Sequence, residues 1–187
     1  MGGRSTKICS TRTTIFVMHC SDLLEQKNNK SKIGFNCSSF DLLHAGHITM
    51  LKMEKQLCDY LIVALQVDPT IDRPGMKNKP VQSVYERYVQ LQGCRYVDEI
   101  LVYETEFDLL QLIKTQTIHI RFLSDEYLNR DFTGKQYCID NNIELHYHTR
   151  QHVYSSTELR ERVARLENSK SEDKSISLSQ HSLDLIK

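Results

Sequence analysis

The sequence lacks tryptophan, has only three prolines and seven glycines in 187 residues, and carries no net charge. A net charge of zero argues against a protein that binds nucleic acid through a broadly basic surface. No apolar run is long enough to cross a membrane, and Ile15–Met18 is also too short for the core of a secretory signal. The apolar fraction of 40% nevertheless suffices for a core, which excludes a wholly disordered chain.

The cysteines add another absence, because no two of them form a Cys-x-x-Cys pair. Their irregular spacing excludes a zinc ribbon and argues against a framework of disulfides. We therefore expect reduced thiols and a cytoplasmic location. The six residues are Cys9, Cys20, Cys37, Cys58, Cys94 and Cys138.

The zero net charge is the sum of unlike regions. Residues 1–31 contain five Lys and Arg and two acids, whereas residues 32–167 contain 16 basic and 19 acidic residues. An anion that binds the middle region must therefore be held by a local cluster of groups, because the overall field there is repulsive. We expect 1–31 to be a flexible extension, 32–167 to be the single folded domain, and the Ser-, Lys- and acid-rich residues 168–187 to be a disordered tail.

Between the terminal regions, short apolar runs alternate with segments of helical spacing. The run Tyr60–Leu65 is continuously apolar, as a parallel strand buried on both faces requires. The pattern predicts an α/β domain, with a doubly wound, Rossmann-like, five-stranded parallel sheet and helices on both faces. Ligands of such sheets bind beyond the carboxyl ends of the strands, where the strand order reverses. The expected strands are 33–37, 60–65, 99–103, 118–123 and 143–147, and the expected helices are 48–57, 83–91, 106–114, 133–141 and 155–166.

The loop after the first expected strand carries His44 and His47, three residues apart at the start of a helix. Backbone N–H groups and the helix dipole favour an anion there, and Gly46 would let a phosphate approach the backbone. The pair is also compatible with ordinary surface or core histidines. We expect no metal site, because the other candidate ligands are spaced two and four apart across a strand end and a loop. Those candidates are His146, His148 and His152.

The sequence around His44 and His47, FDLLHAGHITMLKMEKQLCDYLIVAL, resembles the cytidylyltransferases of the HxGH nucleotidyltransferase superfamily, whose motif is GxFDxxHxGH. Three later segments resemble the same family in the same order. They are a lysine-containing loop followed by SVYER (79–87), RYVDE (95–99) and RQHVYSSTELR (150–160). The similarity covers roughly residues 32–166 and is closest to glycerol-3-phosphate cytidylyltransferases.

The resemblance implies an enzyme that transfers CMP from CTP, bound with Mg²⁺, to a small phosphomonoester and releases pyrophosphate, with glycerol 3-phosphate favoured as the acceptor. The acceptor phosphate is already anionic, so such an enzyme needs no general base and acts by holding anions together. The resemblance also implies a homodimer through Arg95–Glu99. Catalysis is expected of His44, His47, Lys77 and Arg150, nucleotide binding of Ser38, Ser39, Phe40, Asp41, Gly46, Asp125, Ser155, Ser156 and Thr157, and acceptor binding of Lys79, Arg87 and Arg130.

Several of these assignments have alternatives. The loop 69–80 can be aligned in more than one register, so either Lys77 or Lys79 is the candidate catalytic lysine. Ser155–Thr157 would also suit plain capping of a helix. Asp41 would suit any of three roles: orienting a histidine, orienting a Mg²⁺-bound water, or capping the helix. Arg130, together with Glu126 or Tyr127, is assigned from its place in the loop 124–134 alone.

The sequence departs from the family pattern at four loop positions. Ser38 and Ser124 replace glycines, and Gln151 and Val153 replace the threonine and glycine that follow the arginine in the family. A Cβ in such a loop removes positive φ or a close backbone approach. Because the charged groups for phosphoryl transfer are present, we favour an active enzyme. The alternatives are an adenylyltransferase of the same superfamily and a non-catalytic nucleotide-binding or dimerisation module.

Overall fold

The computed structural model describes residues 32–149 and 154–184. The expected extension 1–31 and the expected catalytic residue Arg150 lie outside the described residues. The described strands are β1 (Ile33–Ser38), β2 (Tyr60–Gln66), β3 (Glu99–Tyr103), β4 (Ile120–Ser124) and β5 (Glu144–His148). All neighbouring strands are parallel, and their order is β3-β2-β1-β4-β5. The predicted doubly wound parallel sheet is therefore confirmed.

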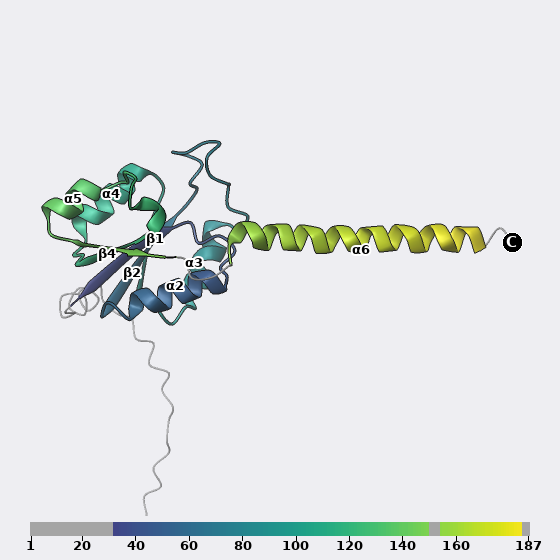
Figure 1. Ribbon diagram of the computed structural model, residues 1–187, viewed down its shortest axis with the longest axis horizontal. Coiled ribbons are helices and arrows are strands. Elements are labelled where there is room, and N and C mark those ends of the chain that lie inside the picture. The colour runs from purple at the N-terminus through teal and green to yellow at the C-terminus, as the bar shows by residue number, and fades with distance from the viewer. Residues whose placement is uncertain (1–31, 150–153, 185–187) are drawn as a thin grey trace, which may run out of the picture. The chain divides into compact units, whose positions relative to one another are not determined.

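Helices cover both faces of this sheet (Figure 1). On one face, α2 (Ala45–Lys55) and α3 (Val84–Gln92) bury Leu51 and Leu91 against the strands. On the other face, α4 (Glu106–Thr115) and α5 (Lys135–Asp140) bury Leu109, Ile113 and Cys138 in a second cluster. A short 3₁₀ helix, η1 (Asp125–Tyr127), follows β4 and was not predicted.

The apolar pattern explains the two-sided burial. All seven residues of β2 are buried, because this strand has a neighbour on each side and helices on both faces. Gly34 of β1 allows one close approach: a Cβ there would lie 2.6 Å from the Phe122 ring and 2.7 Å from Cys58 Sγ. The four cysteines within the described residues are free thiols, as expected.

The sequence also determines where the helices begin. Ser83 and Glu86 form a capping box at the start of α3, and Thr105 and Asp108 form another at the start of α4. The last helix, α6 (Ser156–Asp184), differs from the prediction, since it continues through most of the expected disordered tail. No glycine or proline occurs from Ser156 onward, so neither of the two residues that most strongly end helices interrupts α6.

None of the helices within 32–149 and 154–184 is both long and apolar enough to cross a membrane.

Candidate active site

A cavity of about 650 Å³ lies at the carboxyl ends of the strands. The chain runs from β1 outward to β2 and β3 and then returns to place β4 on the other side of β1, so the strand order reverses between β1 and β4. Ser38 and Ser124, the last residues of these two strands, both line the cavity. The site therefore lies where the topology predicts a ligand.

The cavity reaches over both faces of the sheet, because successive residues of a strand point to opposite faces. We call its two parts the histidine arm, on the α2 side, and the arginine arm, on the α4 side. The histidine arm includes Asn36, His44, His47, Met50, Met53 and His148. The arginine arm includes Cys37, Arg73, Tyr103, Glu106, Arg121 and Thr133.

His44 and His47 are held by the backbone at the start of α2. His44 is the N-cap residue, and its Nδ1 accepts the Gly46 N–H at 3.1 Å. The Nδ1 of His47 accepts the His44 N–H at 3.4 Å, and the two rings stack with centroids 4.0 Å apart. A ring nitrogen that accepts an N–H carries no proton in the neutral imidazole, so each ring carries its proton on Nε2. The pair therefore offers N–H donors beside the positive end of a helix.

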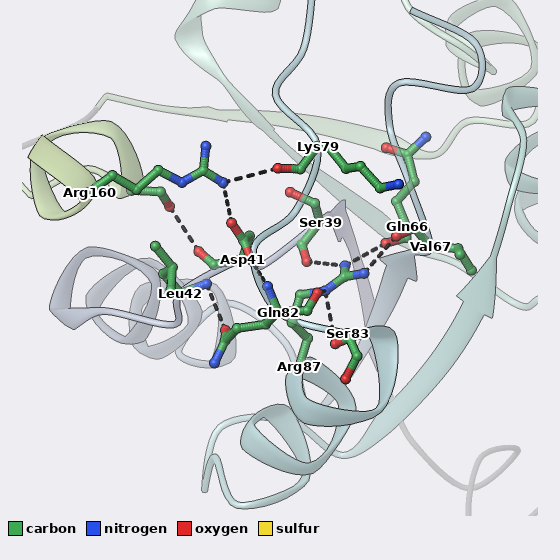
Figure 2. Close-up of polar contacts among 11 residues, drawn as sticks. Ser39, Asp41, Leu42, Gln66, Val67, Lys79, Gln82, Ser83, Arg87 and Arg160 are labelled. Atoms are coloured by element: carbon green, nitrogen blue, oxygen red, sulfur yellow. Dashed lines mark hydrogen bonds and ion pairs between the residues drawn. The ribbon is translucent and has the colours of Figure 1, made fainter. Parts of the chain in front are cut away.

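Asp41 joins this loop to the start of α6 (Figure 2). Its carboxylate accepts the Gln82 N–H at 3.0 Å and pairs with Arg160, and its carbonyl accepts the Ser156 hydroxyl at 2.9 Å. Burial alone would raise the pKa of this carboxyl, but the N–H groups of Gln82 and Val81 and the Arg160 guanidinium together lower the pKa below its usual value. Asp41 is thus an ionised link between two loops, and it does not cap α2.

Arg160 was not among the expected site residues, although it ends the RQHVYSSTELR segment. Ser156 and Arg160 are four residues apart, so they lie on the same side of α6 and both reach Asp41. This spacing within the motif was the available indication of its role.

Arg87 was expected to bind the acceptor, but in the structure it contacts backbone carbonyls instead (Figure 2). Its side chain is 1% exposed, and it does not line the cavity. The guanidinium donates to the carbonyls of Ser39 and Gln66 at 2.7 Å and of Val67 at 2.6 Å, and its Nε donates to the Gln82 carbonyl at 3.1 Å. Because its N–H groups serve backbone carbonyls of two strand ends and a helix start, Arg87 supports the loops around the site.

The structure brings most of the other expected residues together. Lys77 lines the cavity, whereas Lys79 is exposed and does not. Phe40 is buried and packs against the His47 ring with centroids 5.5 Å apart. Asp125 and Arg130 do not line the cavity, but Glu126 and Tyr127, from the same loop, do. The expected residues that line it are Ser38, Ser39, Asp41, His44, Gly46, His47, Lys77, Ser155, Ser156 and Thr157.

The start of α6 serves as both a cap and a wall of the cavity. The Ser155 hydroxyl accepts the Glu158 N–H at 3.1 Å, which is ordinary N-capping. Ser155 and Thr157 also line the cavity. The two functions that the sequence left open for this segment are therefore compatible in one geometry.

A buried carboxyl group lies beneath the histidine arm. Glu54 of α2 is 2% exposed, and its Oε1 accepts the Asn36 amide at 2.5 Å and lies 3.7 Å from His148 Nδ1. Burial raises the pKa of Glu54 to about 8, against the lowering effect of the Asn36 hydrogen bond. Glu54 was not among the expected site residues, although it lies within the expected helix 48–57.

The arginine arm contains an unusual cation, Arg121 of β4, which is 2% exposed. Its guanidinium donates to the Thr133 carbonyl at 2.5 Å and lies over the Phe132 ring at 4.9 Å. Nearby, Arg73 pairs with Glu106 at 3.0 Å, and the Thr133 hydroxyl donates to the same carboxylate. None of these residues was predicted; a single charged residue inside the otherwise apolar strand IRFLS was the available indication.

Comparison with solved structures supports the fold. A lipopolysaccharide core biosynthesis protein from Thermoplasma volcanium aligns over 66% of this chain and 98% of its own, with a TM-score of 0.51 and 23% sequence identity. A family model described as cytidylyltransferase-like matches residues 35–162. This range includes the carboxyl ends of β1 and β4 and the loops that follow them, which line the cavity. The chain belongs to the cytidylyltransferase-like family. The predicted resemblance is thereby confirmed at the level of the family.

The curated relatives that this chain matches have different names, and one of the two described here is named for an acceptor. A probable ethanolamine-phosphate cytidylyltransferase from Encephalitozoon cuniculi is 36% identical over 100 residues, which cover 54% of this chain and 30% of the relative. A bifunctional protein HldE from Helicobacter hepaticus is 33% identical over 111 residues, which cover 58% of this chain and 22% of the relative. The chain thus spans less than a third of the length of either relative.

Two of the departures from the family pattern have no conformational cost. Ser38 is the last residue of β1 and does not have positive φ, and Ser124 has φ −72° and ψ 149°. The positive φ values of the first loop occur at Phe40 and Leu42. A Cβ at positions 38 and 124 therefore demands no strained backbone. Gln151 and Val153 lie outside the described residues.

The cytidylyltransferase-like chain offers Mg²⁺ no ready-made cage within the part that the structure describes. No group of three or more His, Cys, Asp or Glu side chains there could hold a metal ion. Asp41, the carboxylate nearest the histidines in sequence, is already paired with Arg160. These residues fit an ion that arrives on the phosphates of a nucleotide, because Mg²⁺ commonly binds through substrate phosphates and water.

Proposed function

We propose that this chain transfers CMP from CTP to a small phosphomonoester and releases pyrophosphate, with glycerol 3-phosphate as the favoured acceptor. The observation that carries the proposal is the geometry of His44 and His47. Backbone N–H groups fix both rings so that Nε2 donates, at the start of a helix, in a cavity at the point where the strand order reverses. Membership of the cytidylyltransferase-like family supports the same chemistry.

The reaction requires little covalent chemistry from the protein. An oxygen of the acceptor phosphate attacks the α-phosphorus of CTP, and the bond to the pyrophosphate oxygen breaks. Both substrates are anions, so the protein must hold them in line and stabilise the charge that develops on the phosphates. His44 and His47, with the amino end of α2, would donate to phosphate oxygens, and Lys77 would neutralise the transferred phosphate.

The amino end of α6 would hold the rest of the triphosphate. Ser155 and Thr157 line the cavity there, and the link from Asp41 to Ser156 and Arg160 keeps this helix end beside the histidine loop. Mg²⁺ would neutralise phosphate charge when it enters with CTP. Arg150 belongs to the proposal only through its match to the family motif, since it lies outside the described residues.

We also propose a homodimer through Arg95–Glu99. This segment leads into β3, which is an edge strand of the sheet. Arg95 is exposed, whereas Asp98 already accepts the Leu61 N–H at 2.7 Å and pairs with Lys55 at 2.5 Å. Asp98 therefore shapes the surface, and Arg95 is the residue available to a second copy. The cytoplasmic location remains a prediction from the cysteine pattern.

The test is release of pyrophosphate from CTP or ATP in the presence of Mg²⁺ and glycerol 3-phosphate, with CTP binding measured separately by calorimetry. We expect release that depends on the acceptor and prefers CTP by about tenfold or more. Faster release with ATP would replace the proposal by an adenylyltransferase. Binding of CTP without release, for any phosphomonoester supplied, would replace it by a non-catalytic nucleotide-binding module.

A further inference from the structure

The arginine arm contains a buried cation whose hydrogen bonds are incomplete. The Arg121 guanidinium carries five N–H protons. Within the described residues, its oxygen acceptor is the Thr133 carbonyl. The other contacts are to sulfur, at 3.9 Å from Cys138 and 4.0 Å from Cys37, and Nε is buried without a partner. Within the described residues, Arg121 forms no ion pair. A buried charge without a carboxylate is costly, and oxygen acceptors of a ligand would reduce that cost.

The groups around Arg121 do not neutralise it. Burial raises the pKa of the Cys37 thiol, although Arg121 opposes this, and burial also raises the pKa of the Tyr103 phenol, so both stay uncharged. The Glu106 carboxylate is engaged by Arg73 and by the Thr133 hydroxyl. Glu106 is thus already engaged, and Glu126 and Asp131 also line the cavity. The N–H groups of the arm that lack an oxygen acceptor include those of Arg121 that face sulfur and its Nε.

The division of the cavity assigns the two substrates to different arms. A triphosphate carries the larger charge and would bind where two helix amino ends, those of α2 and α6, face the cavity. The acceptor phosphate must meet the α-phosphate beside the histidines, so the remainder of the acceptor has to extend elsewhere. Within the chain that the structure describes, the arginine arm is the other branch of the same cavity.

We propose that the arginine arm binds the body of the acceptor, and that Arg121 selects a hydroxylated phosphomonoester, a polyol or sugar phosphate, over one that carries an ammonium group. Hydroxyl oxygens accept hydrogen bonds from a guanidinium. An ammonium group has only donors, so it offers the Arg121 N–H groups no acceptor, and the two positive charges repel each other. The proposal rests on the proposed transfer reaction and specifies its acceptor, against the amino-alcohol phosphate named for some relatives.

The first test uses the unaltered chain with CTP and three acceptors: glycerol 3-phosphate, a hexose 1-phosphate and phosphoethanolamine. We expect kcat/KM for glycerol 3-phosphate or for the hexose phosphate to exceed that for phosphoethanolamine by about 100-fold. Turnover of phosphoethanolamine within about fivefold of the better hydroxylated acceptor would overturn this inference and leave the proposed transfer intact. Absence of turnover with every acceptor would overturn both.

The second test replaces the cation by Arg121→Gln, whose amide can still donate to the Thr133 carbonyl. We expect KM for the hydroxylated acceptor to rise about tenfold, with kcat and the Kd for CTP within about threefold of the parent, and the preference over phosphoethanolamine to shrink. Arg165→Gln, an exposed arginine on α6, is the matched control and should change neither constant. An equal rise in the Kd for CTP would show that Arg121 serves the nucleotide and would overturn the inference.

Arg121 is buried, so its replacement can reduce folding, and a second variant keeps the test decisive. Arg73→Gln changes a partly exposed residue of the same arm and breaks its pair with Glu106. The same acceptor-specific rise in KM is expected, with a thermal midpoint close to that of the parent. Acceptor constants that stay unchanged in this variant would contradict the assignment of the arm.

Discussion

The two arms of the cavity achieve their polarity in different ways. In the histidine arm, backbone N–H groups hold the polar side chains in place, and the ends of two helices supply the positive potential. In the arginine arm, the charge belongs to side chains, and Arg121 has few acceptors. The hydrogen bonds that hold His44 and His47 lie within a short stretch of chain. The arginine arm depends on residues from a strand, a loop and a helix that meet only in the folded protein.

On the proposed function, this difference predicts which features relatives share and which features distinguish them. A phosphate site built from backbone and helix ends suits any nucleoside triphosphate and any acceptor, because it contacts only phosphate groups. A site built from side chains changes with each substitution. On the proposed function, the histidine arm would carry the reaction common to the family, and the arginine arm would set the acceptor.

The largest effect is expected from removal of the histidine donors. His44→Ala and His47→Ala should each lower kcat about 100-fold, because each removes a group that stabilises charge in the transition state. The loss should be the same for every acceptor, in contrast to Arg121→Gln. Steady-state release of pyrophosphate measures it.

His44 is also the N-cap of α2, so its replacement by alanine combines two effects. His44→Asn is the matched control, since asparagine caps a helix well but does not place a donor where Nε2 lies. An equal loss in His44→Ala and His44→Asn assigns the effect to the donor. Turnover of His44→Asn within a few-fold of the parent would contradict the role of the imidazole and make the two arms less different than proposed.

A smaller effect is expected from the link between α6 and the histidine loop. Arg160→Gln should lower the free energy of unfolding by about 2 kcal/mol, because it leaves the buried Asp41 carboxylate without its cation. The side chain of Arg160 is 26% exposed, so the loss stays below that of a fully buried pair. CTP should bind more weakly, and the acceptor KM should not change.

Chemical denaturation and calorimetry measure these two quantities. Arg162→Gln, an exposed arginine in the same helix, is the control and should leave both unchanged. Weaker acceptor binding in Arg160→Gln would show that the two arms are coupled, and would contradict separate binding of the nucleotide and the acceptor.

The pH dependence of stability should originate in the histidine arm. Glu54 has a pKa of about 8 in the folded chain, against an ordinary value of 4.5. The folded state thus favours the protonated Glu54 carboxyl. The stabilisation of the folded state by this proton is complete below about pH 4.5 and is lost as the pH rises to about 8. The slope is about 1.4 kcal/mol per pH unit for one proton. Glu54→Gln mimics the protonated form, so it should remove this slope.

Denaturation at several pH values between 5 and 9 measures the difference between parent and variant. The difference should grow with pH in favour of Glu54→Gln, whereas the exposed Glu161→Gln should follow the parent. In the arginine arm, burial raises the pKa of the Cys37 thiol and of the Tyr103 phenol. A constant difference between Glu54→Gln and the parent would contradict the buried, protonated carboxyl.

The same contrast explains what the sequence could reveal. Alternating patterns predicted the strands and most helix ends to within a few residues, because each pattern is local. They placed the start of α2 at Ile48 although it begins at Ala45, since His44 caps the helix with a ring nitrogen, which is an unusual cap. His44 and His47 of the histidine arm were predicted because they occur in one motif. Arg121 and Glu54 gain their properties from burial in the fold, which no motif records.

The smallest effect should come from restoring the family glycines at the ends of β1 and β4, where the two arms meet. Ser38→Gly and Ser124→Gly should lower stability by up to about 1 kcal/mol, because glycine gains more freedom in the unfolded chain. Turnover should stay within about twofold, since neither position has positive φ in this protein. A gain of tenfold or more would show that a Cβ at the junction obstructs the phosphates. Unchanged turnover would instead mean that this chain differs from its family's pattern at the junction without loss, and that its distinguishing residues lie deeper, in the arginine arm.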